Sequence, residues 1–223
     1  MPPPDATPGD EDHEQKKARH KKQTADLPVY NLAGAENFIR RKLKRNLPPQ
    51  LTYHGFHHTE DVLNAVLQIA TAENIAAEDI QLLRIAALFH DSGFTELYKH
   101  HEEKGCEIAR ENLPLFGFTE KDIDRICGMI MATKIPQRPL NKMEEILCDA
   151  DLDYLGRDDF YTISRTLMEE LIIYDVLKNE QRWDEMQVKF LSAHHYFTDY
   201  SKRERAPQKQ QYLEALKKKL QLQ

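Results

Sequence analysis

The sequence predicts an all-α fold on two observations. Apolar residues recur at three- and four-residue spacing along most of the chain from Leu27 onward, as on the buried stripe of a helix. No segment alternates apolar and polar residues with a period of two over the length of a strand, and the chain has only 8 glycines. The expected helices span residues 35–47, 59–73, 77–90, 101–112, 120–133, 142–155, 158–178, about 184–197 and 209–220.

The chain divides by composition into a tail and one domain. Residues 1–27 combine prolines and clusters of both charges with almost no large apolar side chain, so they cannot bury enough surface to offset chain entropy. We predict a disordered tail over residues 1–27. The remaining residues, 28–223, are within the size that one helical domain can absorb.

Composition excludes several classes of protein. No run approaches the ~20 apolar residues that a membrane-spanning helix needs, and the N-terminus lacks the apolar segment of a secretory signal. A cytoplasmic protein without a membrane partner is therefore expected. The formal net charge of -6 disfavours nucleic acid as a partner. Cys106, Cys127 and Cys148 lie among apolar residues and far from any CxxC spacing, so we expect reduced core cysteines.

Ionisable residues on the inward stripe of a packed helix need an explanation, because an unpaired polar group is costly to bury. At the start of the second expected helix, His58 is in register with Val62, whereas the adjacent His57 is in register with Asp61. His58 is therefore expected to face the core and His57 the solvent.

The third expected helix ends in an adjacent histidine and aspartate. His90 shares a stripe with Leu83, and Asp91 follows at the helix end, two residues before Gly93. Both side chains are expected to emerge together from a buried helix terminus.

Three aspartates compete in the segment DADLD. Asp149 and Asp153 continue an i, i+4 row that begins at Glu145, which predicts that they face solvent. Asp151 aligns with Leu147 and is the one expected to face the core.

Two imidazoles and two carboxylates that converge from three helices make a mixed nitrogen and oxygen site. Such a site is suited to a divalent cation of Mn, Fe, Co, Ni, Zn or Mg. It differs from a closed site in which thiolates bind the metal. Each residue alone is more easily explained as a hydrogen-bonded core histidine or a capping aspartate. The conjunction of the four favours a metal site.

Three segments, YHGFHHTEDV, AALFHDSGF and ILCDADLDYLG, resemble in order and spacing the HD-domain superfamily of metal-dependent phosphohydrolases, including its stand-alone bacterial members. The resemblance covers roughly residues 50 to 160. It implies an HD-domain helical bundle in which His58, His90, Asp91 and Asp151 hold the catalytic metal. It also implies hydrolysis of a phosphomonoester or phosphodiester, expected to be a nucleotide or another small phosphorylated metabolite.

The resemblance also suggests roles beyond the metal ligands. Asp91 is the natural residue to orient the attacking water. His54 stands in a YHxxxH arrangement similar to that of cyclic-nucleotide phosphodiesterases in the superfamily, which makes it a candidate general acid, with a helix-capping histidine as the alternative. His101 shares a helical stripe with Ile108 and is a candidate ligand for a second metal or for substrate.

Two departures from the superfamily pattern narrow the function. Two-metal members of the superfamily supply a further histidine from the segment that reads MIMATKIPQRP here, and this segment has none. The site is therefore expected to bind one metal. An HD-type diiron oxygenase is disfavoured, because it needs two complete iron sites. Guanosine-tetraphosphate hydrolases of the superfamily have an HDxxED motif, and here Glu96 lies two positions too late for it. Guanosine tetraphosphate is therefore disfavoured as the substrate. The competing class is a catalytically weak HD module that binds a nucleotide as a sensor.

Other side chains have weaker indications. Lys134, Arg138 and Arg157 lie close in sequence to the metal-bearing segments and are candidates to neutralise a substrate phosphate, or are ordinary surface charges. Trp183 is a candidate to stack on a nucleobase, although aromatic residues at helical spacing are more often part of the core.

Overall fold

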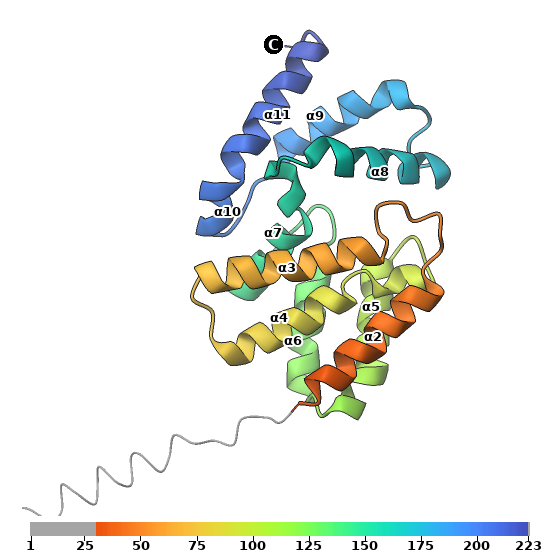
Figure 1. The fold of residues 1–223 in the computed structure, drawn as a ribbon, viewed down its shortest axis with the longest axis vertical. Coiled ribbons are helices and arrows are strands. Elements are labelled where there is room, and N and C mark those ends of the chain that lie inside the picture. The colour runs from red at the N-terminus through yellow and green to blue at the C-terminus, as the bar shows by residue number, and fades with distance from the viewer. Residues whose placement is uncertain (1–29, 223) are drawn as a thin grey trace, which may run out of the picture. The chain divides into compact units, whose positions relative to one another are not determined.

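The computed structural model describes residues 30–222. These residues contain ten α-helices, four short 3-10 helices and no strand, which confirms the predicted all-α fold (Figure 1). The predicted tail, residues 1–27, lies outside the described residues. The α-helices are α2 (Leu32–Asn46), α3 (Phe56–Ala72), α4 (Ala77–Phe89), α5 (His101–Asn112), α6 (Glu120–Ala132), α7 (Lys142–Asp151), α8 (Phe160–Ile173), α9 (Trp183–Ala193), α10 (Asp199–Glu204) and α11 (Ala206–Lys219). The 3-10 helices are η1 (Ser92–Thr95), η2 (Leu113–Phe116), η3 (Asp153–Gly156) and η4 (Glu180–Arg182).

Most predicted helix bounds agree with the structure to within a few residues, with three differences. The helix expected over 142–155 ends at Asp151 and is followed by η3, and the helix expected over 158–178 is α8, which ends at Ile173. Helix α10 was not predicted, because six residues are too few to establish a helical period. Its start is nevertheless marked in the sequence by Thr198, whose side chain accepts a hydrogen bond from the backbone N–H of Ser201.

Helices α2 to α7 pack around α4. Helix α4 contacts α2, α3 and α6, and every residue of its segment 85–89 is buried. The C-terminal part of α4 is enclosed on all sides, which is why residues 85–89 are all apolar and show no polar face. Its C-terminal end, and the residues that follow it, therefore lie deep in this layer.

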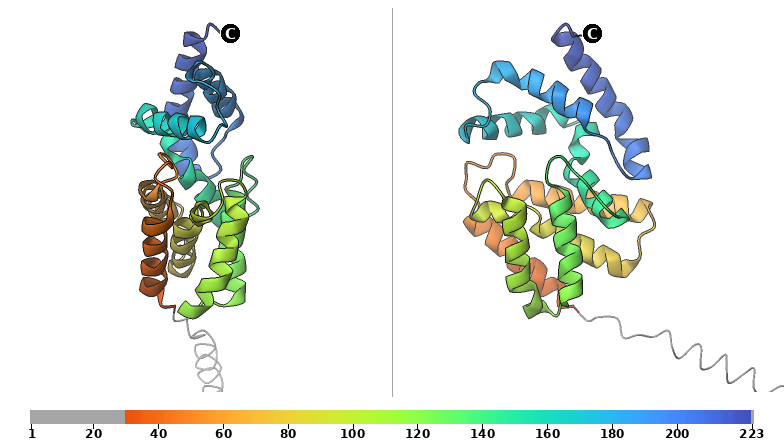
Figure 2. Two further views of the ribbon diagram at one scale, coloured as in Figure 1. Left: turned by 90° about the vertical axis from the view of Figure 1, so that its right-hand side faces the viewer. Right: turned by 180° about the vertical axis from the view of Figure 1, so that it is seen from behind.

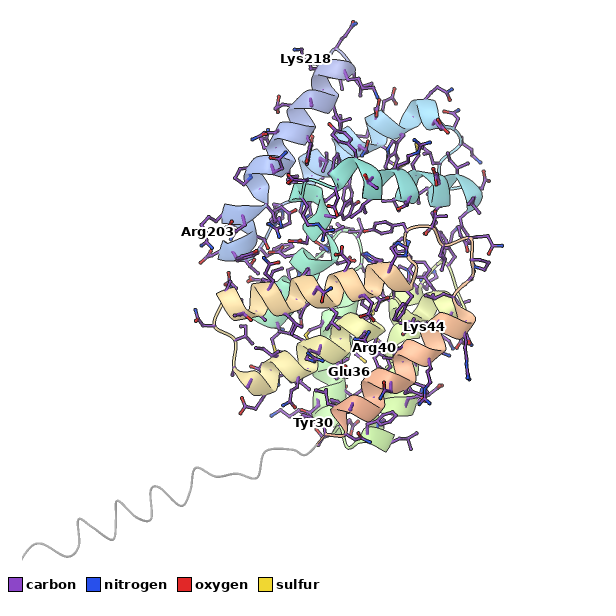
Figure 3. All side chains as sticks on the ribbon, viewed as in Figure 1. Tyr30, Glu36, Arg40, Lys44, Arg203 and Lys218 are labelled. Atoms are coloured by element: carbon purple, nitrogen blue, oxygen red, sulfur yellow. The ribbon has the colours of Figure 1, made fainter. Side chains whose placement is uncertain are left out.

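Ion pairs on the surface fix the position of α2 relative to α3 and α4. Glu36 accepts from Arg84 of α4 at 2.5 Å, and Arg40 pairs with Glu60 of α3. Lys44 lies over the ring of Phe56, 4.5 Å from its centroid. Glu36, Arg40 and Lys44 follow one another along α2 in Figure 3. Exposed pairs of this kind contribute little stability each, so they mainly orient the helix.

Helices α8, α9, α10 and α11 form a second layer over one end of the first, as Figures 1 and 2 show. An apolar cluster joins them to η3 and includes Leu155, Phe160, Leu191 and Leu213. Gly156 permits this contact, because a Cβ there would overlap the backbone of Arg205. The layer therefore lies directly above the residues that end α7.

The three cysteines are buried and free, as predicted for core cysteines. Cys106 and Cys127 face each other between α5 and α6, and Cys148 donates to the carbonyl of Ala132. No helix in the described part of the chain is long and apolar enough to cross a membrane.

Candidate metal centre

His58 lies in the first turn of α3 and is 5% exposed, while the adjacent His57 is exposed, as the helical register predicted. The backbone N–H of His58 donates to the carbonyl of Gly55, which caps this turn. Helix α3 packs against both α4 and α7, so its inward face looks toward the ends of those two helices.

His90 and Asp91 directly follow α4. His90 is fully buried, and its Nδ1 is 2.7 Å from the carbonyl oxygen of Ala87. A carbonyl only accepts, so Nδ1 carries the hydrogen and Nε2 has its lone pair free to bind a cation. Asp91 is 4% exposed and its Oδ2 lies 3.1 Å from His90 Nε2.

Asp151 is the last residue of α7 and completes the group. Its Oδ1 lies 3.1 Å from Nε2 of His58 and 3.5 Å from Nε2 of His90. One nitrogen or oxygen atom each from His58, His90 and Asp151 lie within 4.8 Å of one another. Asp91 joins them, since its Oδ2 is 3.5 Å from His58 Nε2. Three helix ends thus bring the four predicted residues together.

The electrostatics of this group suit a cation. Burial alone would raise the pKa of Asp151, yet the hydrogen bond to His58 and the charges of His90 and His58 lower it. Burial likewise opposes charge on His90, but the Asp91 and Asp151 carboxylates raise the pKa of His90 well above its ordinary value. The two carboxylates therefore attract positive charge to this point.

Two atoms of the group are buried without a hydrogen-bond partner among the described residues, His90 Nε2 and Asp91 Oδ2. Leaving such atoms unpaired is costly unless something else satisfies them. Both belong to residue types that bind divalent transition metals, and both point into the group. The donor set therefore fits a divalent cation bound by two nitrogens and one or two carboxylates.

His54 lies beside the group and is held by a residue that sequence reasoning missed. The carboxylate of Glu170, fully buried on α8, accepts from the backbone N–H groups of Tyr53 and His54 at 2.8 and 2.9 Å. Its other oxygen is 2.5 Å from Nδ1 of His54. Burial opposes charge on His54, but the hydrogen bond to Glu170 and the Asp91 charge raise the pKa of His54 above its ordinary value.

His101, at the start of α5, approaches Asp91 from the other side. Its Nε2 lies 3.6 Å from Asp91 Oδ1 and 3.5 Å from Oε1 of Glu102, a buried acid that was not predicted. The ring of His101 stacks on Phe94 with centroids 3.9 Å apart. Gly93 allows this approach, because a Cβ there would overlap the backbone of His101.

The three candidate phosphate-binding cations do not join the group. Lys134 pairs with Glu103, and Arg157 donates to both oxygens of Asp61 at 2.9 Å. Arg138 is exposed. None of these three lines the cavity described below.

The prediction that Asp149 and Asp153 face solvent was wrong. Asp149 is fully buried and accepts from the N–H groups of Phe197 and Thr198, and Asp153 is 3% exposed and accepts from Arg205 at 2.7 Å. The i, i+4 row of acidic residues predicts solvent exposure only if α7 has a single buried face. In the structure, the helices after α8 cover the other side as well.

A cavity of about 260 Å³ opens over the candidate ligands His58, His90, Asp91 and Asp151, which we call the metal group because they could hold a cation. Asp91, His54, His101 and Asp151 lie at one end, and side chains of η3, α8 and α9 form the remaining wall. Trp183 lines this cavity, whereas His194 and His195 line a separate one. The site therefore pairs a polar end that can bind a cation with a largely apolar chamber.

Comparison with protein families matches residues 55–154 to the HD domain. The chain carries an HD domain. A search of curated proteins finds no match. Among solved structures, one similar protein is a predicted HD superfamily hydrolase from an uncultured Thermotogales bacterium, with 22% identity and a TM-score of 0.56 over 86% of this chain and 92% of that one. Another is Bacillus subtilis YpgQ in complex with ADP, with 19% identity and a TM-score of 0.57 over 85% of this chain and 96% of that one. The fold is thus that of HD-superfamily hydrolases.

All four candidate metal ligands fall inside the HD domain, and Glu170 and Trp183 fall outside it. The helices after the HD domain therefore contribute the residue that holds His54 and one wall of the cavity.

Proposed function

We propose that this protein is a metal-dependent phosphohydrolase that cleaves a phosphomonoester or phosphodiester of a nucleotide or another small phosphorylated metabolite. The observation that carries the proposal is the convergence of His58, His90, Asp91 and Asp151, with His90 Nε2 and Asp91 Oδ2 buried and unpaired among the described residues. The YpgQ complex with ADP supports a nucleotide as one candidate.

A divalent cation in this site would lower the pKa of water from 15.7 toward ~7 and polarise a phosphoryl oxygen. Asp91 would accept the proton of the attacking water, since its Oδ1 faces His101 at the cavity end while Oδ2 faces the histidines of the group. The water oxygen forms a bond to phosphorus as the ester P–O bond breaks.

His54 is the proposed general acid. Its Nδ1 is occupied by Glu170, so its Nε2 is the atom available to the cavity, where it can give a proton to the leaving oxygen. Glu170 also stabilises the protonated ring, in the way that a buried carboxylate orients a catalytic histidine. Glu170 is thus proposed as a positioning residue that acts through His54.

Metal analysis combined with an activity panel tests the proposal. The purified protein should carry about one divalent transition-metal ion per chain, and His58→Ala or Asp151→Asn should remove most of it. The same variants should lose hydrolysis of phosphate esters by orders of magnitude, roughly 10²-fold or more. Asp158→Asn, an exposed aspartate in the same region of the sequence, is the matched control and should change neither quantity.

Full metal content in both variants would show that the proposed ligand set is wrong. Full metal content in the wild type without turnover of any phosphate ester would instead favour the catalytically weak sensor module.

A further inference from the structure

The cavity over the metal group is polar at one end only. Away from that end its wall consists largely of aliphatic and aromatic side chains from η3, α8 and α9, among them Leu155, Phe160, Leu167, Leu171, Met186 and Phe190. At about 260 Å³, the cavity is close to the lower limit of the ~300 to 1,000 Å³ range typical of small-molecule sites. It therefore fits a compact ligand with an apolar portion.

The charged side chains that line the cavity are acidic, whereas a site that binds several phosphates is expected to have basic ones. Asp91, Glu102 and Asp151 are acidic, and no lysine or arginine among the described residues lines the cavity. Basic side chains on neighbouring segments have other partners: Arg205 donates to Asp153, and Lys209 donates to the carbonyl of Leu191. Positive charge for a phosphate is thus available only at the metal end.

One polar side chain stands apart in the apolar wall. Gln187 of α9 is 8% exposed, lines this cavity and a neighbouring one, and its amide makes no hydrogen bond with any other described residue. The protein leaves this amide unpaired, so a ligand that reaches it from the cavity gains a hydrogen bond and orientation. The amide offers one acceptor and two donors and carries no charge.

We propose that the site selects phosphate esters with a single phosphate and an uncharged, largely apolar or aromatic ester group that hydrogen-bonds to Gln187. This inference rests on the proposed function. The phosphate lies at the metal end, next to His54, and the ester group fills the chamber formed by α8 and α9. A second phosphate would place an unpaired charge among apolar side chains, which is disfavoured.

Binding can be followed by fluorescence, because Trp183 is the only tryptophan of the chain and lines the cavity. To suppress turnover, the metal-loaded His54→Ala variant, which lacks the proposed general acid, is titrated with AMP, ADP and ATP while the fluorescence of Trp183 is followed. AMP should bind at least ~10-fold more tightly than ADP, and ATP should bind more weakly still.

Kinetics on matched esters provide the second measurement. The kcat/KM for 2-phenylethyl phosphate should exceed that for glucose 6-phosphate, which is also an ester of a primary alcohol, and the value for AMP should exceed that for ADP, each by at least ~10-fold. The Gln187→Lys variant adds a cation to the wall and should raise the ADP to AMP ratio of kcat/KM by ~10-fold. Gln181→Lys adds the same charge at an exposed position of η4 and should leave the ratio unchanged.

The outcomes separate this inference from the proposed function. If metal-loaded protein hydrolyses ADP or glucose 6-phosphate as well as the apolar monoesters, the inference is wrong while the phosphohydrolase function stands. If it hydrolyses no phosphate ester, the proposed function itself fails, and the inference fails with it. Should Gln187→Lys not fold, the order of AMP and ADP in the fluorescence titration still decides.

Discussion

Replacing Glu170 with glutamine tests whether this buried carboxylate acts through His54. The substitution keeps the size of the side chain but removes the charge, and it turns one acceptor oxygen into an NH₂ group. In the structure the carboxylate accepts from two backbone N–H groups and from Nδ1 of His54, at 2.8, 2.9 and 2.5 Å. The glutamine oxygen of the variant can still accept from the backbone N–H groups of Tyr53 and His54. Its NH₂ group would face Nδ1 of His54, and two donors cannot form a hydrogen bond with each other.

The expected magnitude follows from these three bonds. Hydrogen bonds to charged groups contribute ~1.5–3 kcal/mol each, and an unsatisfied buried group costs ~1–3 kcal/mol. Glu170 is fully buried, so solvent does not screen the loss. We expect the free energy of unfolding to fall by about 3 kcal/mol, which lowers the thermal midpoint by ~6–12 °C for a domain of this size.

Activity should fall in a way that depends on the leaving group. A positioned general acid contributes ~10²–10⁴-fold to catalysis, so Glu170→Gln should lower kcat on an alkyl phosphate by roughly 100-fold. The leaving group of 4-nitrophenyl phosphate departs without a proton, and the loss there should stay below ~10-fold. A purely structural role for Glu170 would lower both rates by the same factor, and that result would refute the reasoning.

Two further variants sharpen the measurement. Glu169→Gln changes the neighbouring acid, which is exposed and pairs with Arg165, and should leave stability and both rates nearly unchanged. His54→Ala should abolish the effect of Glu170→Gln on the rate with the alkyl ester, because two residues that act as one unit are not additive.

Two predictions concern residues that support the site without joining it. Asp149→Asn should lower the thermal midpoint, since it weakens a fully buried set of bonds to Phe197 and Thr198 by about 2 kcal/mol, while metal analysis should find the ion content unchanged. A loss of metal would show that Asp149 is part of the ligand set. Gly93→Ala should lower the free energy of unfolding in a denaturant titration by about 3 kcal/mol, because its Cβ would overlap the backbone of His101. Gly128→Ala meets only the end of a side chain inside a helix and should be neutral or stabilising, so an equal cost at both glycines would contradict this account.

Helical periodicity predicted the burial of His58 because α3 is a long helix with a clear register. His58 and His57 differ by one position, and only His58 is buried in the structure. The burial of His90 was predictable from the continuous apolar run that precedes it. The convergence of these ends was inferred from four ionisable residues that face the core, and the family resemblance supported it, because register gives the face of a helix and not the distance between helices.

Asp151 lies beside the histidines as expected, but the structure does not support the argument that distinguished it from Asp149 and Asp153. The reasoning excluded Asp149 and Asp153 as solvent-facing, whereas both are more buried than Asp151. What distinguishes Asp151 is its partners: it faces the histidines, while Asp149 accepts from the segment before α10 and Asp153 from Arg205. Helical register does not predict which residues of α7 are exposed, because the second layer covers the side of α7 that a single-layer fold would leave in water.

Glu170 was missed although the sequence holds a signal for it. It is in register with Ile163, Leu167 and Tyr174, whereas Glu169 is in register with Arg165. An ionisable residue on an apolar stripe is the same signal that identified His58, but Glu170 lies beyond the residues that match the HD domain.

The position of Glu170 outside the HD domain also explains how metal binding and substrate choice can be separated in this chain. The proposed metal ligands lie on α3, on α7 and directly after α4, and their geometry depends on the packing of the first layer. The residues proposed to hold His54 and to contact the ester group lie on α8 and α9, which reach the site through an apolar cluster. A substitution such as Gln187→Lys should therefore alter which ester is cleaved without a change in metal content, whereas Asp151→Asn should remove the metal and with it the hydrolysis of every ester.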